Sequence, residues 1–350
     1  MRLARLRAFS RFLFILLLIV FIIVLHIYYD KKEETPSVYE RIQKFKEHHK
    51  INKSCGRFPK SENIYSMSGD WQILRTPETL FLIYGAYLDD RILLKDGPVV
   101  RILMFTSEWN ITEKFYCQYW SGSVKNPMSV KIDEFRVLWK DYWGISNHYT
   151  PILATCKLPP NFDATHVSLS RSPCDESNNV KLISRQKREK DKKDFLVCVK
   201  DLEYDEDKSM ALIEWLEILK VFGAQKVVVY VIKVHEQMMK VLRLYENDGL
   251  VEVIELNHPQ VLPTPKENTL QFLMRQLISY HDCFYRHNNN YKYIIPLDID
   301  EFIIPKFKED RTWNDLLKRV VAKNPRKVFS SAAFVAQNAF FFIDELKNFH

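Results

Sequence analysis

The chain has 350 residues and a formal net charge of +7. The positive excess is local, because four arginines precede residue 12 and a further group of basic residues lies within residues 185–193. The mixed charge run at residues 185–193 is typical of a solvated linker, so the net positive charge does not predict binding to a nucleic acid.

The N-terminal segment has the pattern of a signal anchor. Residues 12–29 are apolar or aromatic throughout apart from His26, and at helical rise this stretch is long enough to cross a bilayer. Because arginines cluster in residues 1–11, the positive-inside rule places that tail in the cytosol. A cleaved signal peptide is the alternative, but the apolar core is longer than a signal h-region and no small-residue cleavage site follows it. We therefore expect a single-pass type II membrane protein whose folded part is luminal.

Residues 30–69 are polar and rich in Lys and Glu, which predicts a stem that holds the folded part off the membrane. Asn52 and Asn110 begin N-glycosylation sequons on the luminal side and are consistent with this topology. No Cys-x-x-Cys pair occurs, so an oxidising lumen favours disulfides over thiolate metal sites. The cysteines are Cys55, Cys117, Cys156, Cys174, Cys198 and Cys283. We expect the four before residue 180 to pair among themselves.

Residues 70–182 predict a β-rich accessory region. Short apolar and aromatic runs alternate there with turns, of which Asp96-Gly97-Pro98 is the strongest. The runs span residues 80–88, 91–94, 99–105, 115–120, 130–143 and 164–169. The charged residues 183–194 that follow are predicted to form a linker.

Strand and helix patterns alternate over residues 195–350, which predicts an α/β domain with a mostly parallel sheet. The predicted strands are residues 195–199, 226–232, 251–256 and 291–297, and the predicted helices are residues 208–222, 235–246 and 268–287. Gly223 is the natural end of the first helix. The buried stripe expected on the last helix is Leu270, Leu273, Leu277, Tyr280 and Phe284.

Two carboxylates, Asp298 and Asp300, follow the strand predicted over residues 291–297. Strand alternation would place both on one side, where a bound cation or strong hydrogen bonds would be needed to offset their burial. Open α/β sheets bind ligands beyond the carboxyl ends of their strands. The pair therefore predicts a site for a hard divalent cation and a phosphate. Alternation turns Glu301 away, which favours a structural role for it.

Three function classes suit such a site. In the first, a nucleotide-sugar transferase, a cation neutralises the charge that grows on the leaving diphosphate. The second is a phosphohydrolase of the haloacid dehalogenase type, in which the first Asp is the nucleophile. That class has Thr or Val where this chain has Phe302, and its motif follows the first strand, whereas several strands precede the motif here. In the third, a non-enzymatic ectodomain, the pair is structural or binds Ca²⁺. The luminal topology and the strand-terminal position favour the transferase.

Several segments together resemble glycosyltransferase family 92. They are Trp215 within residues 213–216, the run at residues 222–227, Asp282-Cys283 and the run at residues 297–305, in this order and spacing. Residues 87–91 are similar to a segment upstream of the catalytic part in the same family. The likeness covers residues 195 to 350.

The resemblance implies a GT-A-type nucleotide-sugar-binding fold, Golgi residence and dependence on Mn²⁺. It also implies transfer of galactose from UDP-galactose to fucose in the core of N-glycans. Asp298 and Asp300 would then hold the metal and the diphosphate. The expected reaction is a direct displacement, in which a carboxylate deprotonates an acceptor hydroxyl while UDP departs.

Four further residues are candidates for binding the nucleotide-sugar. Arg275 and Gln276 lie on the helix that leads to the carboxylate pair and could reach the diphosphate or the ribose, although both could also be ordinary exposed helix residues. Lys200 and Asp201 follow the first strand of the α/β domain, where such folds hold the base and the ribose.

The end of the chain departs from the family pattern. GT-A enzymes take a late metal ligand, an acceptor pocket and, when they invert, a general base from sequence well beyond the carboxylate pair. Asp344 and Glu345 are the candidate bases within the residues present. We expect a truncated sequence or a short isoform, and an inactive short form of the transferase is the corresponding alternative.

Overall fold

The computed structural model describes residues 58–68, 71–91, 94, 97–122, 124–139, 148–263, 268–326, 331–337 and 339. The predicted tail and anchor, most of the predicted stem, Asn52, Cys55, Asp344 and Glu345 lie outside these residues. Among the described helices, none combines the length and the apolar character that a membrane span requires. The chain divides into two units, residues 1–50 with 159–161 and residues 51–158 with 162–350, and every described helix and strand belongs to the second.

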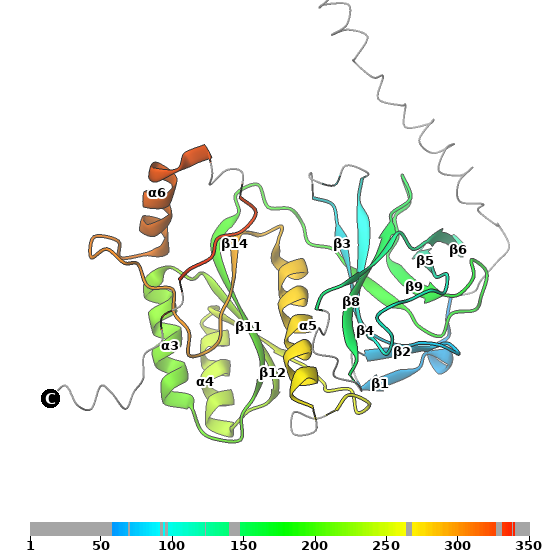
Figure 1. Cartoon of the computed structure of the whole chain (residues 1–350), viewed down its shortest axis with the longest axis horizontal. Helices are drawn as coiled ribbons and strands as arrows, with labels where there is room; N and C mark the ends of the chain where they lie inside the picture. Colours follow the sequence, from blue (N-terminus) through cyan, green and yellow to red (C-terminus); the bar gives the residue numbers. More distant parts are fainter. Residues whose placement is uncertain are drawn as a thin grey trace, which may run out of the picture. The chain divides into compact units, whose positions relative to one another are not determined.

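Ten of the described strands form one curled sheet (Figure 1). A single 3₁₀ turn, η1 (Ser61–Asn63), precedes them. The strands are β1 (Ser66–Ser68), β2 (Trp71–Arg75), β3 (Leu80–Asp89), β4 (Val99–Thr106), β5 (Tyr116–Ser121), β6 (Val124–Lys131), β7 (Glu134–Val137), β8 (Thr150–Lys157), β9 (His166–Ser170) and β10 (Lys181–Ser184). Their order is β6-β5-β9-β10-β3-β4-β8-β7, with β2 also on β3 and β1 on β2. All neighbours are antiparallel except β10 and β3.

The predicted strands of this region are partly correct. Those over residues 80–88, 99–105, 115–120 and 164–169 match β3, β4, β5 and β9 closely. The run over residues 130–143 is divided between β6 and β7, and β1, β2, β8 and β10 were not predicted. In the run predicted at residues 91–94, Arg91 and Leu94 are described, and neither lies in a strand.

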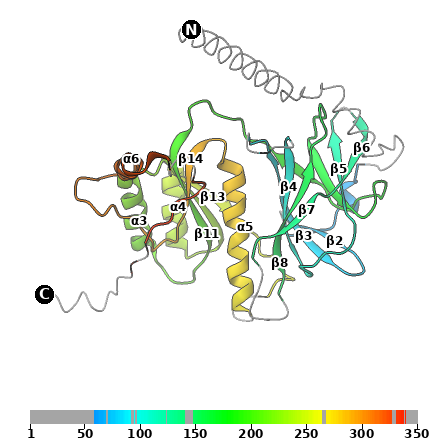
Figure 2. The same cartoon turned by 45° about the horizontal axis from the view of Figure 1, so that its top comes forward.

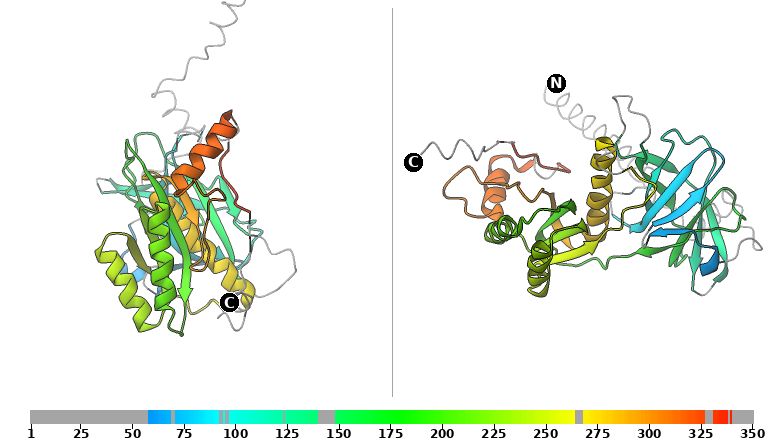
Figure 3. Two further views of the ribbon diagram at one scale, coloured as in Figure 1. Left: turned by 90° about the vertical axis from the view of Figure 1, so that its left-hand side faces the viewer. Right: turned by 90° about the horizontal axis from the view of Figure 1, so that it is seen from below.

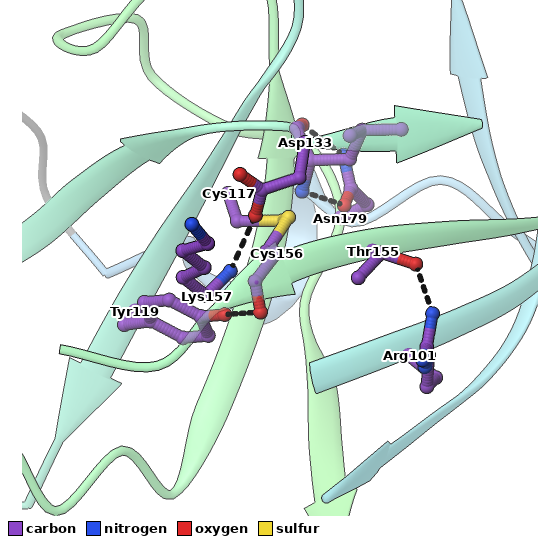
Figure 4. The surroundings of a disulfide bond; sticks show 9 residues. Arg101, Cys117, Tyr119, Asp133, Thr155, Cys156, Lys157 and Asn179 are labelled. Carbon is purple, nitrogen blue, oxygen red and sulfur yellow. Dashed lines mark hydrogen bonds between the residues drawn. A yellow bond between two sulfur atoms is a disulfide. The ribbon is translucent and has the colours of Figure 1, made fainter. Parts of the chain in front are cut away.

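A disulfide closes the curled sheet. Cys117 of β5 is bonded to Cys156 of β8, and these strands lie near opposite ends of the strand order. Figure 4 shows the hydroxyl of Tyr119 donating to the carbonyl of Cys156 at 3.1 Å. This pairing agrees with the prediction for the cysteines before residue 180, and Cys174 also forms a disulfide.

Four described strands form a second, entirely parallel sheet. They are β11 (Lys193–Glu203), β12 (Lys226–Lys233), β13 (Val251–Glu255) and β14 (Tyr291–Pro296), in the order β13-β12-β11-β14. The helices of this part are α3 (Ser209–Phe222), α4 (Glu236–Asn247), α5 (Thr269–His287) and α6 (Trp313–Lys323). The parallel sheet and the first three helices were predicted to within a few residues.

Helices cover both faces of the parallel sheet (Figures 1 and 2). Alternate residues of β11, among them Val197 and Val199, pack with Trp215 of α3 and Leu242 of α4 in one apolar core. Residues of the opposite parity, such as Leu196 and Cys198, face α5. A second disulfide, Cys198–Cys283, fixes α5 to this face.

The buried side of α5 differs from the predicted stripe. Leu270 is buried as expected, but Leu273 is 36% exposed. Instead, α5 contacts the parallel sheet on one side and β3, β4 and β8 on the other, so most of its circumference is enclosed (Figure 3). The fully buried positions therefore include polar side chains, which are Gln271, Arg275, Ser279 and Asp282.

Gly223 ends α3 in the left-handed conformation, with a φ of 103°. Its N–H donates to the carbonyls of Leu219 and Lys220, each at 3.1 Å. An added Cβ would meet no atom within 4 Å, so only the backbone conformation disfavours a side chain here. We expect Gly223→Val to lower the free energy of unfolding by about 1–2 kcal/mol. Thermal unfolding checks this, with Gly223→Asn as the control because Asn tolerates the left-handed region; equal melting temperatures for the two variants would contradict the explanation.

Candidate functional site

The carboxylate pair lies at the carboxyl edge of the parallel sheet, but not within a strand. β14 ends at Pro296, and Asp298 and Asp300 belong to the turn that follows. The N–H of Glu301 donates to the carbonyl of Asp298 at 3.0 Å and closes this turn. The predicted strand alternation of the pair is therefore wrong: Asp298 is half-buried, whereas Asp300 is exposed.

Asp298 is held by two donors from different elements. The ammonium of Lys200 forms an ion pair with its Oδ2, and the hydroxyl of Tyr280 donates to its Oδ1 at 3.2 Å. The parallel register sets this up, because Cys198 lies opposite Pro296 and the next residues along each strand lead to Lys200 and Asp298. Burial and the Asp298 carboxylate raise the pKa of Tyr280, so this hydroxyl remains a proton donor at neutral pH.

A β-bulge in β11 changes the directions in which the side chains after Val199 point. Val199 pairs with Val229, but Leu202 pairs with Val231, so β11 has one more residue than β12 over this stretch. Bulges re-aim side chains and are common beside functional sites. Here Leu202 returns to the core shared with α3 and α4, while Asp201 bonds to side chains of α5 on the other face of the sheet.

Arg275 is a buried cation shared by two carboxylates. Its Nε donates to Asp201 at 2.7 Å and its second guanidinium nitrogen donates to Glu203, also at 2.7 Å. Ser279 donates to the other oxygen of Asp201 at 3.4 Å. Burial raises the pKa of Asp201 even though Arg275 opposes the rise. The possibility that Arg275 is an ordinary exposed helix residue is thus excluded, and its guanidinium is occupied by the protein itself.

Two polar side chains with buried amide or ring nitrogens lie near Arg275. Nε2 of Gln276 has no hydrogen-bond partner among the described residues, and the ring of His258 interacts with the backbone of Leu262. Burial and the charge of Arg275 lower the pKa of His258, whereas Glu203 raises it. His258 was missed by the sequence reasoning, because a lone histidine in a loop carries no signal of its own.

Two tryptophans position the segment that follows the carboxylate pair. The indole N–H of Trp215 donates to the carbonyl of Glu301 at 2.9 Å, and that of Trp313 donates to the carbonyl of Ile303 at 2.8 Å. The side chain of Glu301 turns back and accepts from the N–H of Asp298 at 3.1 Å. Glu301 thus has structural contacts, but they arise in a turn, whereas its predicted structural role rested on strand alternation.

The side chains gathered here carry an excess of negative charge. When ionised they supply two positive and five negative charges, a net charge of −3, from Lys200, Arg275, Asp201, Glu203, Asp298, Asp300 and Glu301. A diphosphate would add to this excess, so its binding requires a further cation.

The carboxylate pair fits a divalent cation in part. Carboxylate oxygens are suitable ligands, and Lys200 already holds a positive charge against Asp298. Asp300 has no hydrogen bond or ion pair among the described residues. Within these same residues, however, no group of three His, Cys, Asp or Glu side chains could hold a metal. Asp298 and Asp300 could therefore supply two ligands of a divalent cation, and the described residues do not supply a third.

Comparison with protein families identifies the α/β part of the chain. Residues 193–347 match the family model described as glycosyltransferase family 92. The matched range contains the whole parallel sheet, the carboxylate pair and every side chain of the site described above. A search of curated proteins found no match for the chain.

Proposed function

Residues 193–347 belong to glycosyltransferase family 92, and we propose that the protein is a type II Golgi hexosyltransferase. It transfers a hexose, galactose from UDP-galactose, to a glycan acceptor such as the fucose of an N-glycan core. The observation that carries the proposal is the placement of Asp298, paired with Lys200, and of Asp300 in the same turn at the carboxyl edge of a parallel sheet, within the matched residues. Open sheets with this strand direction bind nucleotides at that edge, which also supports a GT-A-like fold.

The site residues have different roles in binding the donor. Asp298 and Asp300 would hold Mn²⁺ or another divalent cation, which when bound supplies positive charge that stabilises the departing UDP. Tyr280 orients Asp298 by its hydrogen bond, and Arg275 holds Asp201 and Glu203 in place by ion pairs. The amide N–H₂ of Gln276 has no partner among the residues that the structure describes and can donate to a donor phosphate or ribose.

The chemistry is direct displacement at the anomeric carbon of the donor. The acceptor hydroxyl loses its proton to a carboxylate and attacks the sugar as the bond to UDP breaks. Asp344 and Glu345 remain the candidate bases, and both lie outside the described residues.

Disulfide chemistry supports a luminal location. The Cys117–Cys156 and Cys198–Cys283 pairs persist in an oxidising compartment and are rare in the cytosol. Residues 12–29 would anchor the chain in the Golgi membrane, and the Asn110 sequon would then face the glycosylation machinery.

The test measures transfer and hydrolysis of UDP-galactose by the purified full chain, with Mn²⁺ and with a chelator. Asp300→Ala is expected to lower the Mn²⁺-dependent rate at least about 100-fold, because a carboxylate that holds the cation is lost. Asp163→Ala removes an exposed carboxylate of the β-rich region and serves as the control. Equal turnover in all conditions would exclude the metal role, and a folded chain without Mn²⁺-dependent UDP-galactose binding would favour a non-enzymatic ectodomain or an inactive short form.

A further inference from the structure

The two cations of the site differ in their freedom to move. The side chain of Arg275 is 3% exposed and is bonded to two carboxylates. The side chain of Lys200 is 21% exposed and forms an ion pair with one carboxylate, that of Asp298. A guanidinium is a planar fork fixed by paired hydrogen bonds, whereas an ammonium is a point charge on a flexible stem. Lys200 is therefore the cation that can change partner.

Lys200 also lies where an incoming cation would bind. Its ammonium occupies Oδ2 of Asp298, and the hydroxyl of Tyr280 occupies Oδ1. A divalent cation bound by Asp298 would compete with this ammonium for the same carboxylate, and the repulsion between like charges would weaken its binding. If the ammonium moved to a donor phosphate, the repulsion would fall and the lysine would gain a new anionic partner.

We propose that Lys200 is an exchangeable internal counter-ion: it neutralises Asp298 in the empty site, yields to a divalent cation and binds the donor diphosphate. The inference rests on the proposed function and adds a coupling to it. Because the diphosphate draws Lys200 away from Asp298, the nucleotide and the cation each strengthen the binding of the other.

Lys200→Met separates this exchange from a static role. With the full chain, free Mn²⁺ is measured by electron paramagnetic resonance without nucleotide, and UDP binding is measured by calorimetry in saturating Mn²⁺. We expect the variant to bind Mn²⁺ alone about tenfold more tightly and to bind UDP about tenfold more weakly. A static ion pair that only maintains the turn would move both affinities downward.

The matched control is Lys233→Met. Lys233 ends the neighbouring strand β12 and forms an exposed ion pair with Asp205 at 2.5 Å, so the variant removes the same charge from the same sheet edge. It should change each affinity by less than about twofold. Lys200→Gln repeats the test with a polar neutral side chain should the methionine variant fold poorly.

A second variant tests the exchange from the other side. In Asp298→Asn, Lys200 has lost its internal partner and should bind UDP without Mn²⁺ more tightly than the wild type does. The inference is wrong if this increase is missing, or if the two affinities of Lys200→Met do not shift in opposite directions. A wild-type chain that binds neither Mn²⁺ nor UDP would overturn the proposed function as well. If the wild type binds both, a negative result for the variants contradicts only the exchange proposed for Lys200.

Discussion

Replacement of Asp282 by alanine is expected to lower the free energy of unfolding by about 4 kcal/mol. Asp282 is completely buried on α5 and accepts hydrogen bonds from the hydroxyls of Tyr87 and Tyr230, the second at 2.6 Å, and from Nε of Arg286 at 2.7 Å. Without the carboxylate, two buried hydroxyls lose their acceptor. Arg286 contributes less to the loss, because its side chain is partly exposed and can turn to solvent.

The position of Asp282 makes this loss matter for the whole folded unit. Tyr87 lies on β3 of the curled sheet and Tyr230 on β12 of the parallel sheet, so one carboxylate connects both sheets through α5. Burial raises the pKa of both tyrosines and the neighbouring carboxylate raises it further, which keeps their hydroxyls protonated as donors.

Urea unfolding followed by tryptophan fluorescence measures the effect of Asp282→Ala. Tyr230→Phe is the comparison, because it removes one hydroxyl and leaves the carboxylate with its other donors; it should cost about 1–2 kcal/mol. Asp282→Asn should fall between the two, since an amide retains one acceptor oxygen. An alanine variant no less stable than Tyr230→Phe would show that the carboxylate is not the shared acceptor inferred here.

Local patterns predicted the α/β part of the chain well. A strand at residues 226–232 and helices such as α3 and α4 depend on apolar periodicity and on a stop residue such as Gly223, and both signals lie within the segment itself. The same reasoning found the order of elements and hence the parallel sheet, whose strands are joined by helical crossovers.

Features that depend on long-range contacts were not predictable. The polar side chains of α5 would not be expected on a buried surface from the sequence alone. Their partners lie on β3, β11 and β12, which are distant in the sequence. Gly85 is a similar case: an added Cβ would collide with the hydroxyl of Tyr87, but nothing in the sequence near Gly85 indicates this.

The candidate site was predicted by position rather than by contact. Asp298 and Asp300 were located correctly beyond a strand, whereas Lys200 and Asp201, which were predicted to follow the first strand, lie within β11 (Lys193–Glu203). Lys200 and Asp201 have different partners because of the bulge after Val199, and no sequence pattern predicts this bulge. Tyr280 was assigned to an apolar stripe, although its hydroxyl donates to Asp298.

Arg275→Met is the second variant with a large expected effect, a loss of about 3–5 kcal/mol near neutral pH. The substitution preserves much of the side-chain volume but leaves Asp201, which is almost fully buried, without its counter-charge. Glu203→Gln is the control. Its carboxylate is 34% exposed, so removal of that partner should cost less than about 1 kcal/mol.

The pH dependence of Arg275→Met identifies the cause of the loss. Burial already raises the pKa of Asp201, and removal of Arg275 raises it further, so the folded variant holds its proton more tightly than the unfolded chain does. Stability that depends on a raised carboxyl pKa is retained at acid pH and lost as the pH rises. The difference in unfolding free energy between wild type and variant should therefore be smallest near pH about 4 and grow towards pH 8. Asp201→Asn in the Arg275→Met background should recover part of the loss at pH 8, because it removes the unpaired charge. A deficit that is the same at every pH and is not relieved by Asp201→Asn would instead assign the role of Arg275 to packing.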